Sequence, residues 1–468
     1  MLRILILAAG KGKRMKSNIP KVLHKLLNKP MISWVVNTAK KLNPESIAVV
    51  LGHKAEEVRR ILDEDINVFI QSELLGTGHA VMCAKDFLKF DGDVLILYGD
   101  VPNVKVETLK EMIEKHRMEN NSMTILTTFL SNPRGYGRIV RNDSGKIISI
   151  IEETDADEEI KKIKEVNSGI CVFKASDLIN SLKYLKNDNK QGEYYLTDIV
   201  KIFLDSGKNV GTFLTEDPNE ILGINDRMQL SKVERLLRLR VNEEHMLNGV
   251  TIVDPESTFI DPEVVIEMDT IIQPSTIIYG NTKIGRGCEI GPFTIIKDCT
   301  IENNVKIVQS NCEGAWIFSN TSIGPFARLR PKTTIKENVK IGNFVEVKNS
   351  IIEQDVKAGH LSYIGDSEVG EGTNIGAGTI TCNYDGFMKH KTKIGKRVFI
   401  GSNSALVAPV MVGEGAIIGA GSVITEDVPN DSLGLGRARQ VNKKGWAKRW
   451  REKKEKEVQG LKPKNKDA

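Results

Sequence analysis

A glycine-rich turn near the start of the chain combines backbone amides with positively charged side chains. The stretch LAAGKGKRM follows a short apolar run and places Gly10 and Gly12 beside Arg14, and PKVLH supplies Lys21. Backbone N–H groups in such a turn can bind phosphate oxygens, while the cations neutralise the remaining charge. The spacing matches neither GxxxxGK[ST] nor GxGxxG, so a purely structural turn stays an alternative. The stretch is a candidate site for a nucleotide phosphate.

Other polar residues in the first half follow strand-like runs or tight turns. LYGD ends an apolar run with Asp100, at the strand edge where ligands usually bind, although an aspartate there could also cap a helix. QSELLGTGHA contributes Gln71, whose amide can read a nucleobase edge, and a second glycine turn. The motifs GYGRI, IIEE, VNSGI and GIND add Gly137, Glu152, Asn167 and Asn225. No Ser/His/Asp or Cys/His arrangement accompanies them, so we expect no protein nucleophile in this half.

Two cations in the second half are expected to lie on neighbouring strands. Leu329 and Val347 are eighteen residues apart in a regular repeat, so Arg330 and Lys348 follow equivalent positions. Neighbouring strands lie about 4.8 Å apart, and like charges directly opposite one another are destabilising unless an anion lies between them. This pattern predicts a phosphate site, and the alternative is a pair of solvated surface cations.

A histidine follows these cations in the stretch AGHLSYIG. His360 comes just after Ala358, which stands where the repeat usually has a larger aliphatic residue. A lone histidine is more often structural than catalytic, but beside an anion site it can deprotonate an amine that attacks a thioester. The interrupted repeat at TCNYDGFMKHKTK brings Asn383, Tyr384 and Lys389 into the same region.

The elements that must position the first set of residues form an alternating α/β pattern up to about residue 225. This alternation predicts an α/β domain on a largely parallel sheet, followed by a long linking helix. The strand-like runs are Ile4–Leu7, Ile47–Leu51, Val94–Tyr98, Met123–Phe129 and Gly169–Phe173, and Pro30–Leu42 has helical spacing. We expect domains at residues 1–226 and 250–468, joined by a helix over 227–249.

The second half has an apolar residue at every sixth position. The inward series are Ile260 to Ile296, Ile317 to Val347 and Ile394 to Ile424. Six is a multiple of the two-residue strand period, so three short strands per eighteen-residue coil give a triangular parallel β-helix. Enrichment in Ile, Val, Thr and Gly disfavours a helical bundle. The spacing does not give the hand, and the general crossover rule favours a right-handed one.

Composition limits the class of protein. With 468 residues and 40% hydrophobic content, the chain can form at least two folded domains. No stretch reads as a signal peptide or a membrane span, so we expect a cytoplasmic protein with no membrane partner. The net charge of +5 is concentrated in KKGWAKRWREKKEKEVQGLKPKNK, which is either a solvated tail or a patch for an anionic ligand; no nucleic-acid partner is expected. The six widely spaced cysteines should be reduced and mostly buried.

Taken in order, these motifs resemble one family over nearly the whole chain. LAAGKGKRM, PKVLH, QSELLGTGHA, LYGD, GYGRI, VNSGI and GIND, followed by hexapeptide repeats, look like the bacterial bifunctional N-acetylglucosamine-1-phosphate uridylyltransferase/glucosamine-1-phosphate N-acetyltransferase. The resemblance implies a Rossmann-like nucleotidyltransferase domain and a left-handed β-helix, an exception to the crossover rule. It implies acetyl transfer from acetyl-CoA to glucosamine-1-phosphate, then uridylyl transfer from UTP to N-acetylglucosamine-1-phosphate. The product, UDP-N-acetylglucosamine, would serve peptidoglycan and lipopolysaccharide synthesis.

The resemblance also assigns roles to residues of the first half. UTP would be bound by Leu7, Ala8, Ala9, Gly10, Arg14, Lys21, Gln71, Gly76, Thr77 and Tyr98. Gly137, Glu152 and Asn167 would bind the N-acetyl sugar, and Asp100 and Asn225 would bind Mg²⁺. One carboxylate, one amide oxygen and phosphate oxygens suit that ion, which prefers hard oxygen ligands. The departures from the family pattern, Lys13 and the spacer Lys16 to Ile19, affect none of these contacts.

In the second half the resemblance implies a trimer with acetyl-CoA bound between subunits. His360 would be the base, and glucosamine-1-phosphate would contact Arg330, Lys348, Tyr363, Asn374 and Lys389. Acetyl-CoA would contact Ala377, Asn383, Tyr384, Ser402, Ala420 and Arg437. Part of the basic tail, around GRARQVNKKGW, would lie near the coenzyme phosphates, and the resemblance fades beyond Trp450.

Two other functions use the same order of domains. A sugar-1-phosphate thymidylyltransferase would change the base or the sugar, and Gln71, Glu152 and Asn167 argue against it. A non-catalytic subunit of a translation-initiation exchange factor would need neither metal-binding nor base residues. The joint presence of Asp100, Asn225 and His360 makes that binding-only role improbable.

Overall fold

The computed structural model describes residues 1–461, which form two compact units. The first unit is Met1–Asp298, and the second begins at Cys299. The boundaries expected at 226/227 and 249/250 stay predictions, because the compact units divide within the hexapeptide repeats instead. The last part of the basic tail, KPKNKDA, lies outside the described residues.

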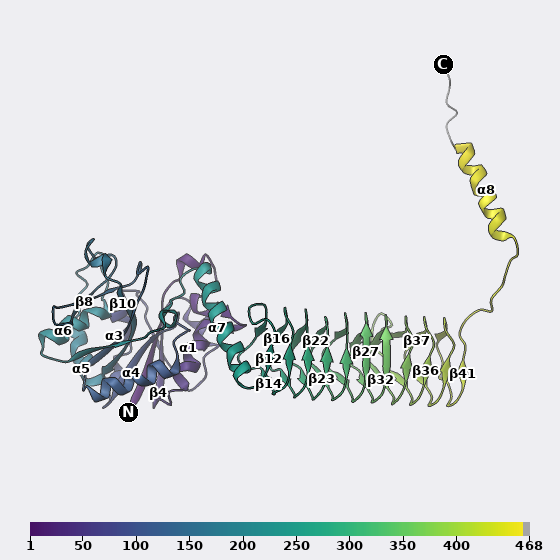
Figure 1. Ribbon diagram of the computed structural model, residues 1–468, viewed down its shortest axis with the longest axis horizontal. Helices are drawn as coiled ribbons and strands as arrows, with labels where there is room; N and C mark the ends of the chain where they lie inside the picture. Colours follow the sequence, from purple (N-terminus) through teal and green to yellow (C-terminus); the bar gives the residue numbers. More distant parts are fainter. Residues whose placement is uncertain (462–468) are drawn as a thin grey trace, which may run out of the picture. The chain divides into compact units, whose positions relative to one another are not determined.

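The first unit opens with a nine-stranded mixed sheet in which seven strands follow the order β11-β7-β10-β6-β1-β4-β5, while β8 pairs with β10 and β9 pairs with β8 (Figure 1). Its strands are β1 (Leu2–Ala8), β4 (Ser46–Leu51), β5 (Asn67–Ile70), β6 (Asp93–Tyr98), β7 (Met123–Phe129), β8 (Arg138–Arg141), β9 (Ile147–Ile151), β10 (Glu165–Lys174) and β11 (Val210–Leu214). β1, β4, β5 and β6 are parallel, but β10 is antiparallel to both β6 and β7. The α/β prediction is therefore confirmed, with one reversed strand at the centre of the sheet.

Helices cover this sheet, and a small hairpin follows the glycine-rich turn. The helices are α1 (Met31–Lys40), α2 (Ala55–Arg59), α3 (Thr77–Cys83), α4 (Val106–Met118), α5 (Ala175–Ser181) and α6 (Ile199–Asp205), with 3-10 turns η1 (Lys13–Met15) and η2 (Lys21–Leu23) and the hairpin strands β2 (Lys25–Leu26) and β3 (Lys29–Pro30). Leu5 and Leu7 of β1 belong to one hydrophobic core, whereas Ile4 and Ile6 belong to another. This alternation buries both faces of the strand, as expected for a sheet covered on two sides.

The predicted long helix is α7 (Arg227–Leu247). Its N-cap is Asp226, whose side chain accepts a hydrogen bond from the backbone N–H of Gln229 at 2.9 Å. That contact satisfies one of the N–H groups left without a partner at a helix start. The helix therefore starts directly after Asn225, one of the residues expected to bind metal.

After α7, the first unit contains eight short parallel strands. They are β12 (Thr251–Ile252), β13 (Phe259–Ile260), β14 (Val265–Ile266), β15 (Ile271–Ile272), β16 (Ile277–Tyr279), β17 (Lys283–Ile284), β18 (Glu289–Ile290) and β19 (Ile295–Lys297). Within this unit, each of the first five pairs with the third strand along the chain, so that Ile260 faces Ile278 and Ile272 faces Ile290. Pairing with every third strand defines a three-sided coil of eighteen residues.

The second unit continues the same rule through twenty-two strands (Figure 1). One sheet has β21 (Lys306–Ile307), β24 (Ser322–Ile323), β27 (Lys340–Asn343), β30 (Lys357–His360), β33 (Asn374–Ile375), β36 (Phe399–Ile400), β39 (Ile417–Ile418) and β41 (Leu433–Gly434). The next has β22 (Asn311–Glu313), β25 (Arg328–Leu329), β28 (Glu346–Lys348), β31 (Tyr363–Gly365), β34 (Ile380–Cys382), β37 (Ala405–Val407) and β40 (Val423–Ile424). The third has β20 (Thr300–Ile301), β23 (Ala315–Ile317), β26 (Thr333–Ile335), β29 (Ile351–Ile352), β32 (Ser367–Val369), β35 (Thr392–Ile394) and β38 (Val410–Val412).

The residues of the six-step series point inward. From Ile317 to Val347 and from Ile394 to Ile424 they are all buried, and the coils form a left-handed parallel β-helix. Leu329 faces Val347 eighteen residues later, but Ile335 faces Ile352 only seventeen residues later. One residue is thus missing from the coil that precedes His360, which is why Ala358 takes the inward position opposite Ile341.

The described part of the chain ends in helix α8 (Trp446–Leu461), whose residues up to Gly460 are exposed, as expected for a solvated tail. Within residues 1–461, no helix has the length and apolar content needed to cross a membrane. None of the six cysteines, all of which lie within residues 1–461, forms a disulfide bond; four are buried and two are half-buried, as predicted.

Candidate functional sites

A cavity of about 350 Å³ opens at the carboxyl ends of β1 and β6. Parallel strands present their carboxyl ends at one edge of the sheet, which is where ligands bind in open α/β folds. The cavity is lined by Leu7, Ala8, Ala9, Gly10, Lys11, Lys21, Val22, Gln71, Leu74, Gly76, Thr77, Ala80, Tyr98, Asp100 and Glu193. All the residues expected to bind UTP are among them except Arg14. Arg14 is exposed on η1 and does not line the cavity.

Two walls of the cavity are fixed by the motif QSELLGTGHA. Gln71 is only 4% exposed, and its Nε2 donates to the carbonyl of Gly76 at 3.0 Å. Gly76 has a φ of +100°, and a Cβ there would lie 2.6 Å from the carbonyl oxygen of Tyr194. Only glycine combines that backbone conformation with so close a neighbour. The turn therefore holds Gln71 and Thr77 at the rim of the cavity.

Lys21, Asp100 and Asn225 meet on one side of this cavity. The Lys21 ammonium forms an ion pair with Asp100 and donates to Asn225 Oδ1 at 2.8 Å. These partners are 79 and 204 residues away along the chain. A carboxylate and an amide oxygen thus converge on a point that already accepts a cation. That donor set suits Mg²⁺, which takes oxygen ligands and keeps several waters. Among residues 1–461, no cluster of three or more His, Cys, Asp or Glu side chains forms a metal site.

The three residues expected to bind the sugar lie together beside the cavity. The Asn167 N–H donates to the Gly137 carbonyl at 2.9 Å, and a Cβ on Gly137 would lie 3.3 Å from Glu152 Oε2. Burial raises the pKa of Glu152, and the nearby Asp198 and Asp155 carboxylates add to this effect against a hydrogen bond from Thr197. Burial also raises the pKa of Tyr98, with further contributions from Cys171, Glu152 and Asp100. Tyr98 therefore connects the cavity with this second group.

Some of the cavity lining was not identified from the sequence. Leu74 lies within the motif QSELLGTGHA, so its apolar side chain could have been predicted to line the cavity. Glu193 comes from a segment more than a hundred residues later, where no spacing signal marks it. Its neighbour Tyr194 reaches the site through its backbone, which accepts a hydrogen bond from the Gly78 N–H at 2.8 Å.

In the second unit, Arg330 and Lys348 lie on adjacent coils, as the repeat predicts. Leu329 pairs in register with Val347, and the Arg330 N–H donates to the Val347 carbonyl at 2.9 Å. The Lys348 side chain is only 16% exposed, which argues against a freely solvated cation. Arg330 pairs with Glu346 at 3.0 Å. Lys348 lowers the pKa of Lys389, and Arg330 contributes in the same direction. Three cations therefore share one small region.

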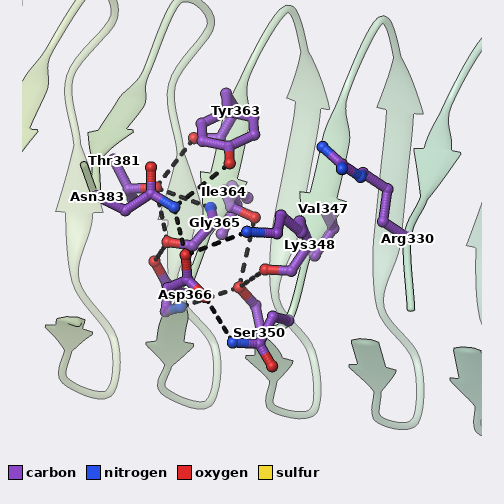
Figure 2. A network of polar contacts seen from close by, with 12 residues as sticks. Arg330, Val347, Lys348, Ser350, Tyr363, Ile364, Gly365, Asp366, Thr381 and Asn383 are labelled. Carbon is purple, nitrogen blue, oxygen red and sulfur yellow. Dashed lines mark hydrogen bonds and ion pairs between the residues drawn. The ribbon is translucent and has the colours of Figure 1, made fainter. Parts of the chain in front are cut away.

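A buried carboxylate lies within this cationic region (Figure 2). Asp366 is 7% exposed, and it accepts hydrogen bonds from the side chains of Asn349 and Asn383, with Lys348 Nζ at 3.5 Å. Burial would raise the pKa of Asp366, but these hydrogen bonds and the Lys348 charge together hold it below its usual value. Asn383 Nδ2 also lies 3.4 Å from the Tyr363 hydroxyl, so two of the candidate residues meet here.

His360 ends β30 and has a side-chain partner on the preceding coil. Its Nδ1 lies 2.6 Å from Oδ1 of Asn343, which is the register partner of His360. A side-chain amide oxygen only accepts hydrogen bonds, so in the neutral imidazole Nδ1 carries the proton and Nε2 has the lone pair. The imidazole is thus held in the form that can accept a proton at Nε2.

Three of the residues expected to contact acetyl-CoA lie at the position equivalent to His360 in later coils. Strand register places Ala358, Ile375, Ile400 and Ile418 in one row, so Ala377, Ser402 and Ala420 follow at the same place as His360 in successive coils. A Cβ on Gly421 would lie 3.8 Å from Arg437 Cδ, so Arg437 lies close to the end of this row. Asn374 lies on β33, next to β30 in the same sheet. Tyr384 is exposed and forms a bridge with Lys389 in the loop after β34.

Comparisons with known proteins match both halves of the chain. Residues 3–219 match the nucleotidyl transferase family, and residues 263–298 and 391–426 match the bacterial transferase hexapeptide (six repeats) family. A protein from Thermosipho africanus named "Bifunctional protein GlmU" is 56% identical over 96% of this chain and 97% of its own length. Proteins of the same name from Fervidobacterium nodosum and Thermotoga maritima are 54% and 55% identical, over 96% and 95% of this chain and 98% of their own lengths.

Proposed function

Because the chain belongs to the family of bifunctional GlmU proteins, we propose that it makes UDP-N-acetylglucosamine at two separate sites. It transfers acetyl from acetyl-CoA to glucosamine-1-phosphate and uridylyl from UTP to N-acetylglucosamine-1-phosphate. The chain is therefore an enzyme with uridylyltransferase and acetyltransferase activities in cell-wall synthesis, not a binding-only subunit. The observation that supports the assignment most is a nucleotide-sized cavity in one compact unit, together with a cluster of three cations and an Asn343-oriented histidine in the other.

In uridylyl transfer, the sugar phosphate oxygen attacks the α-phosphate of UTP in line and pyrophosphate leaves. The task of the protein is to position the reactants and to neutralise charge. Gln71 and the Gly76 turn would hold the nucleotide, and Lys21 would face its phosphates from the cavity wall. Gly137, Glu152 and Asn167 would hold the N-acetyl sugar beside Tyr98.

Asp100 and Asn225 would bind Mg²⁺ at the point where Lys21 now meets them. When bound, the ion would supply positive charge to the phosphate oxygens and help align them. In that state the Lys21 ammonium would turn from the two oxygens toward the phosphates, because like charges repel. Lys21 would therefore contact Asp100 and Asn225 in the metal-free protein and the nucleotide phosphates in the complex.

In acetyl transfer, the amine of glucosamine-1-phosphate attacks the thioester carbonyl of acetyl-CoA. His360 Nε2 would take the proton of the amine as the N–C bond forms. The C–S bond then breaks and the CoA sulfur leaves, taking up a proton. Arg330 and Lys348 would bind the phosphate, while Tyr363, Asn374 and Lys389 would contact the sugar. Ala377, Asn383, Tyr384, Ser402, Ala420 and Arg437 would contact acetyl-CoA.

We also propose that the chain forms a homotrimer and acts in the cytoplasm. Phe326 and Phe344 stack with ring centroids 5.4 Å apart, although each is more than half exposed and has a positive φ. Bulky residues rarely adopt that backbone conformation, and exposed apolar groups of this kind often mark interfaces. Sedimentation equilibrium should give the mass of three chains for the parent and a lower mass for Phe326→Glu. A monomeric parent would rule out the trimer.

The uridylyl specificity is tested by offering UTP and dTTP to the same preparation. With N-acetylglucosamine-1-phosphate, we expect kcat/KM for UTP to exceed that for dTTP by at least tenfold, because Gln71 is held rigidly at the rim of the cavity. Glucose-1-phosphate and dTTP are tested together as the substrates of the alternative enzyme, a thymidylyltransferase, which the family relationship does not favour. Faster turnover of that pair would show that the base and sugar are assigned wrongly.

A further inference from the structure

The geometry points to Asp366 as a positioning residue of the acetyl-transfer site, which couples the phosphate-binding cations to the loop after β34. This inference rests on the proposed acetyltransferase function and names a residue that the sequence motifs do not mark. The argument depends on which groups contact Asp366 and on which coils they come from.

Asp366 joins three successive coils through its side chain. Lys348 comes from the coil before it and Asn383 from the coil after it (Figure 2). Asn349, next to Lys348 in the chain, is the third partner. Oδ1 accepts from Asn349, whereas Oδ2 faces both Lys348 and Asn383. One carboxylate oxygen thus lies between a proposed phosphate ligand and a proposed acetyl-CoA ligand.

The backbone of Asp366 takes part in the same connection. Its N–H donates to the Lys348 carbonyl at 3.0 Å, and its carbonyl accepts from the Thr392 N–H at 3.2 Å. Asn383 and Thr392 flank the loop that carries Tyr384 and Lys389. Asp366 therefore holds both ends of this loop, one through its side chain and the other through its carbonyl. Its φ of +50° is tolerated by Asp and Asn better than by most residues.

Charge explains why a carboxylate is useful at this position. Arg330, Lys348 and Lys389 would repel one another before a phosphate arrives, and Asp366 is the buried anion that faces Lys348. It also opposes the lowering of the Lys389 pKa by the two other cations. Asp366 would thus keep Lys348 in place and Lys389 charged in the absence of substrate.

The inference is tested with Asp366→Asn, which keeps the shape and tolerates the same backbone conformation. We expect KM for glucosamine-1-phosphate to rise roughly tenfold, as for loss of a hydrogen bond to a charged group, with a smaller change in kcat. Without the carboxylate, the Lys389 pKa falls further under the influence of Lys348 and Arg330. The alkaline limb of kcat/KM should therefore move to lower pH, with Tyr363 as the other titratable group on this side.

The matched control is Asp355→Asn, because Asp355 also has a positive φ at a coil corner but is exposed. It should leave KM and the pH profile unchanged. Uridylyl transfer by Asp366→Asn should equal that of the parent. An Asp366→Asn enzyme with parental KM and pH profile would overturn the inference, as would a parallel loss of both activities, which indicates a structural role. Failure of the parent to acetylate glucosamine-1-phosphate would instead overturn the proposed function, and this inference with it.

Discussion

Replacing His360 with alanine is expected to lower acetyl transfer by about 10²- to 10⁴-fold, the usual contribution of a general base. The reason is that the hydrogen bond from His360 Nδ1 to Asn343 leaves Nε2 as the ring nitrogen that can accept a proton. The effect should fall mainly on kcat, because the phosphate-binding cations are retained. The measurement is the rate of CoA release with saturating glucosamine-1-phosphate.

Imidazole added to His360→Ala should restore part of the acetyl-transfer rate, which a merely misfolded variant would not show. The matched control is Lys357→Ala on the same strand, where the side chain is exposed, and it should leave the rate unchanged. Uridylyl transfer by His360→Ala should remain at the parental level. An acetyl-transfer rate within threefold of the parent would exclude His360 as the base.

Replacing Asp100 with asparagine is expected to lower uridylyl transfer by roughly 10³-fold, since metal charge stabilisation contributes several kcal/mol and each 1.36 kcal/mol is a factor of ten. The substitution keeps the size of the side chain but removes the carboxylate that faces Lys21 and Asn225. The Mg²⁺ concentration for half-maximal activity should rise as well. Pyrophosphate release from UTP and N-acetylglucosamine-1-phosphate, measured across a Mg²⁺ titration, gives both quantities.

Asp91→Asn is the control for this change, because Asp91 is an exposed aspartate near the opposite end of β6. It should retain the parental rate and the parental Mg²⁺ dependence. Acetyl transfer by Asp100→Asn should also be unchanged. A variant with normal Mg²⁺ dependence but reduced rate would mean that Asp100 acts through Lys21 alone.

Much of the fold could be predicted because periodicity is a local property of the sequence. The six-step series identified the inward residues of the β-helix, and one register pair, Leu329 with Val347, was enough to place Arg330 beside Lys348. The missing residue between Ile335 and Ile352 was harder to see, since a coil shortened by one residue still places an apolar side chain inside. The antiparallel β10 has the same buried, β-branched composition as a parallel strand, so composition could not give its direction.

The residues of the candidate sites could be predicted where a sequence motif or the family resemblance identified them. The meeting of Lys21 with Asp100 and Asn225 depends on long-range folding, and the resemblance suggested only the two oxygen ligands. Asp366 had no signal at all, because YIGDSE reads as an ordinary coil corner and its partner Asn383 lies seventeen residues later. Arg14 is the opposite case: the sequence predicted that it contacts the nucleotide, but Arg14 does not line the cavity.

The central claim is that one chain carries two independent transferase sites. Mass spectrometry of the purified protein with glucosamine-1-phosphate, acetyl-CoA, UTP and Mg²⁺ tests it most directly. We expect N-acetylglucosamine-1-phosphate and then UDP-N-acetylglucosamine, with CoA and pyrophosphate released in equal amounts once the intermediate is consumed. If the protein converts supplied N-acetylglucosamine-1-phosphate but never acetylates glucosamine-1-phosphate, the assignment of the second site is contradicted.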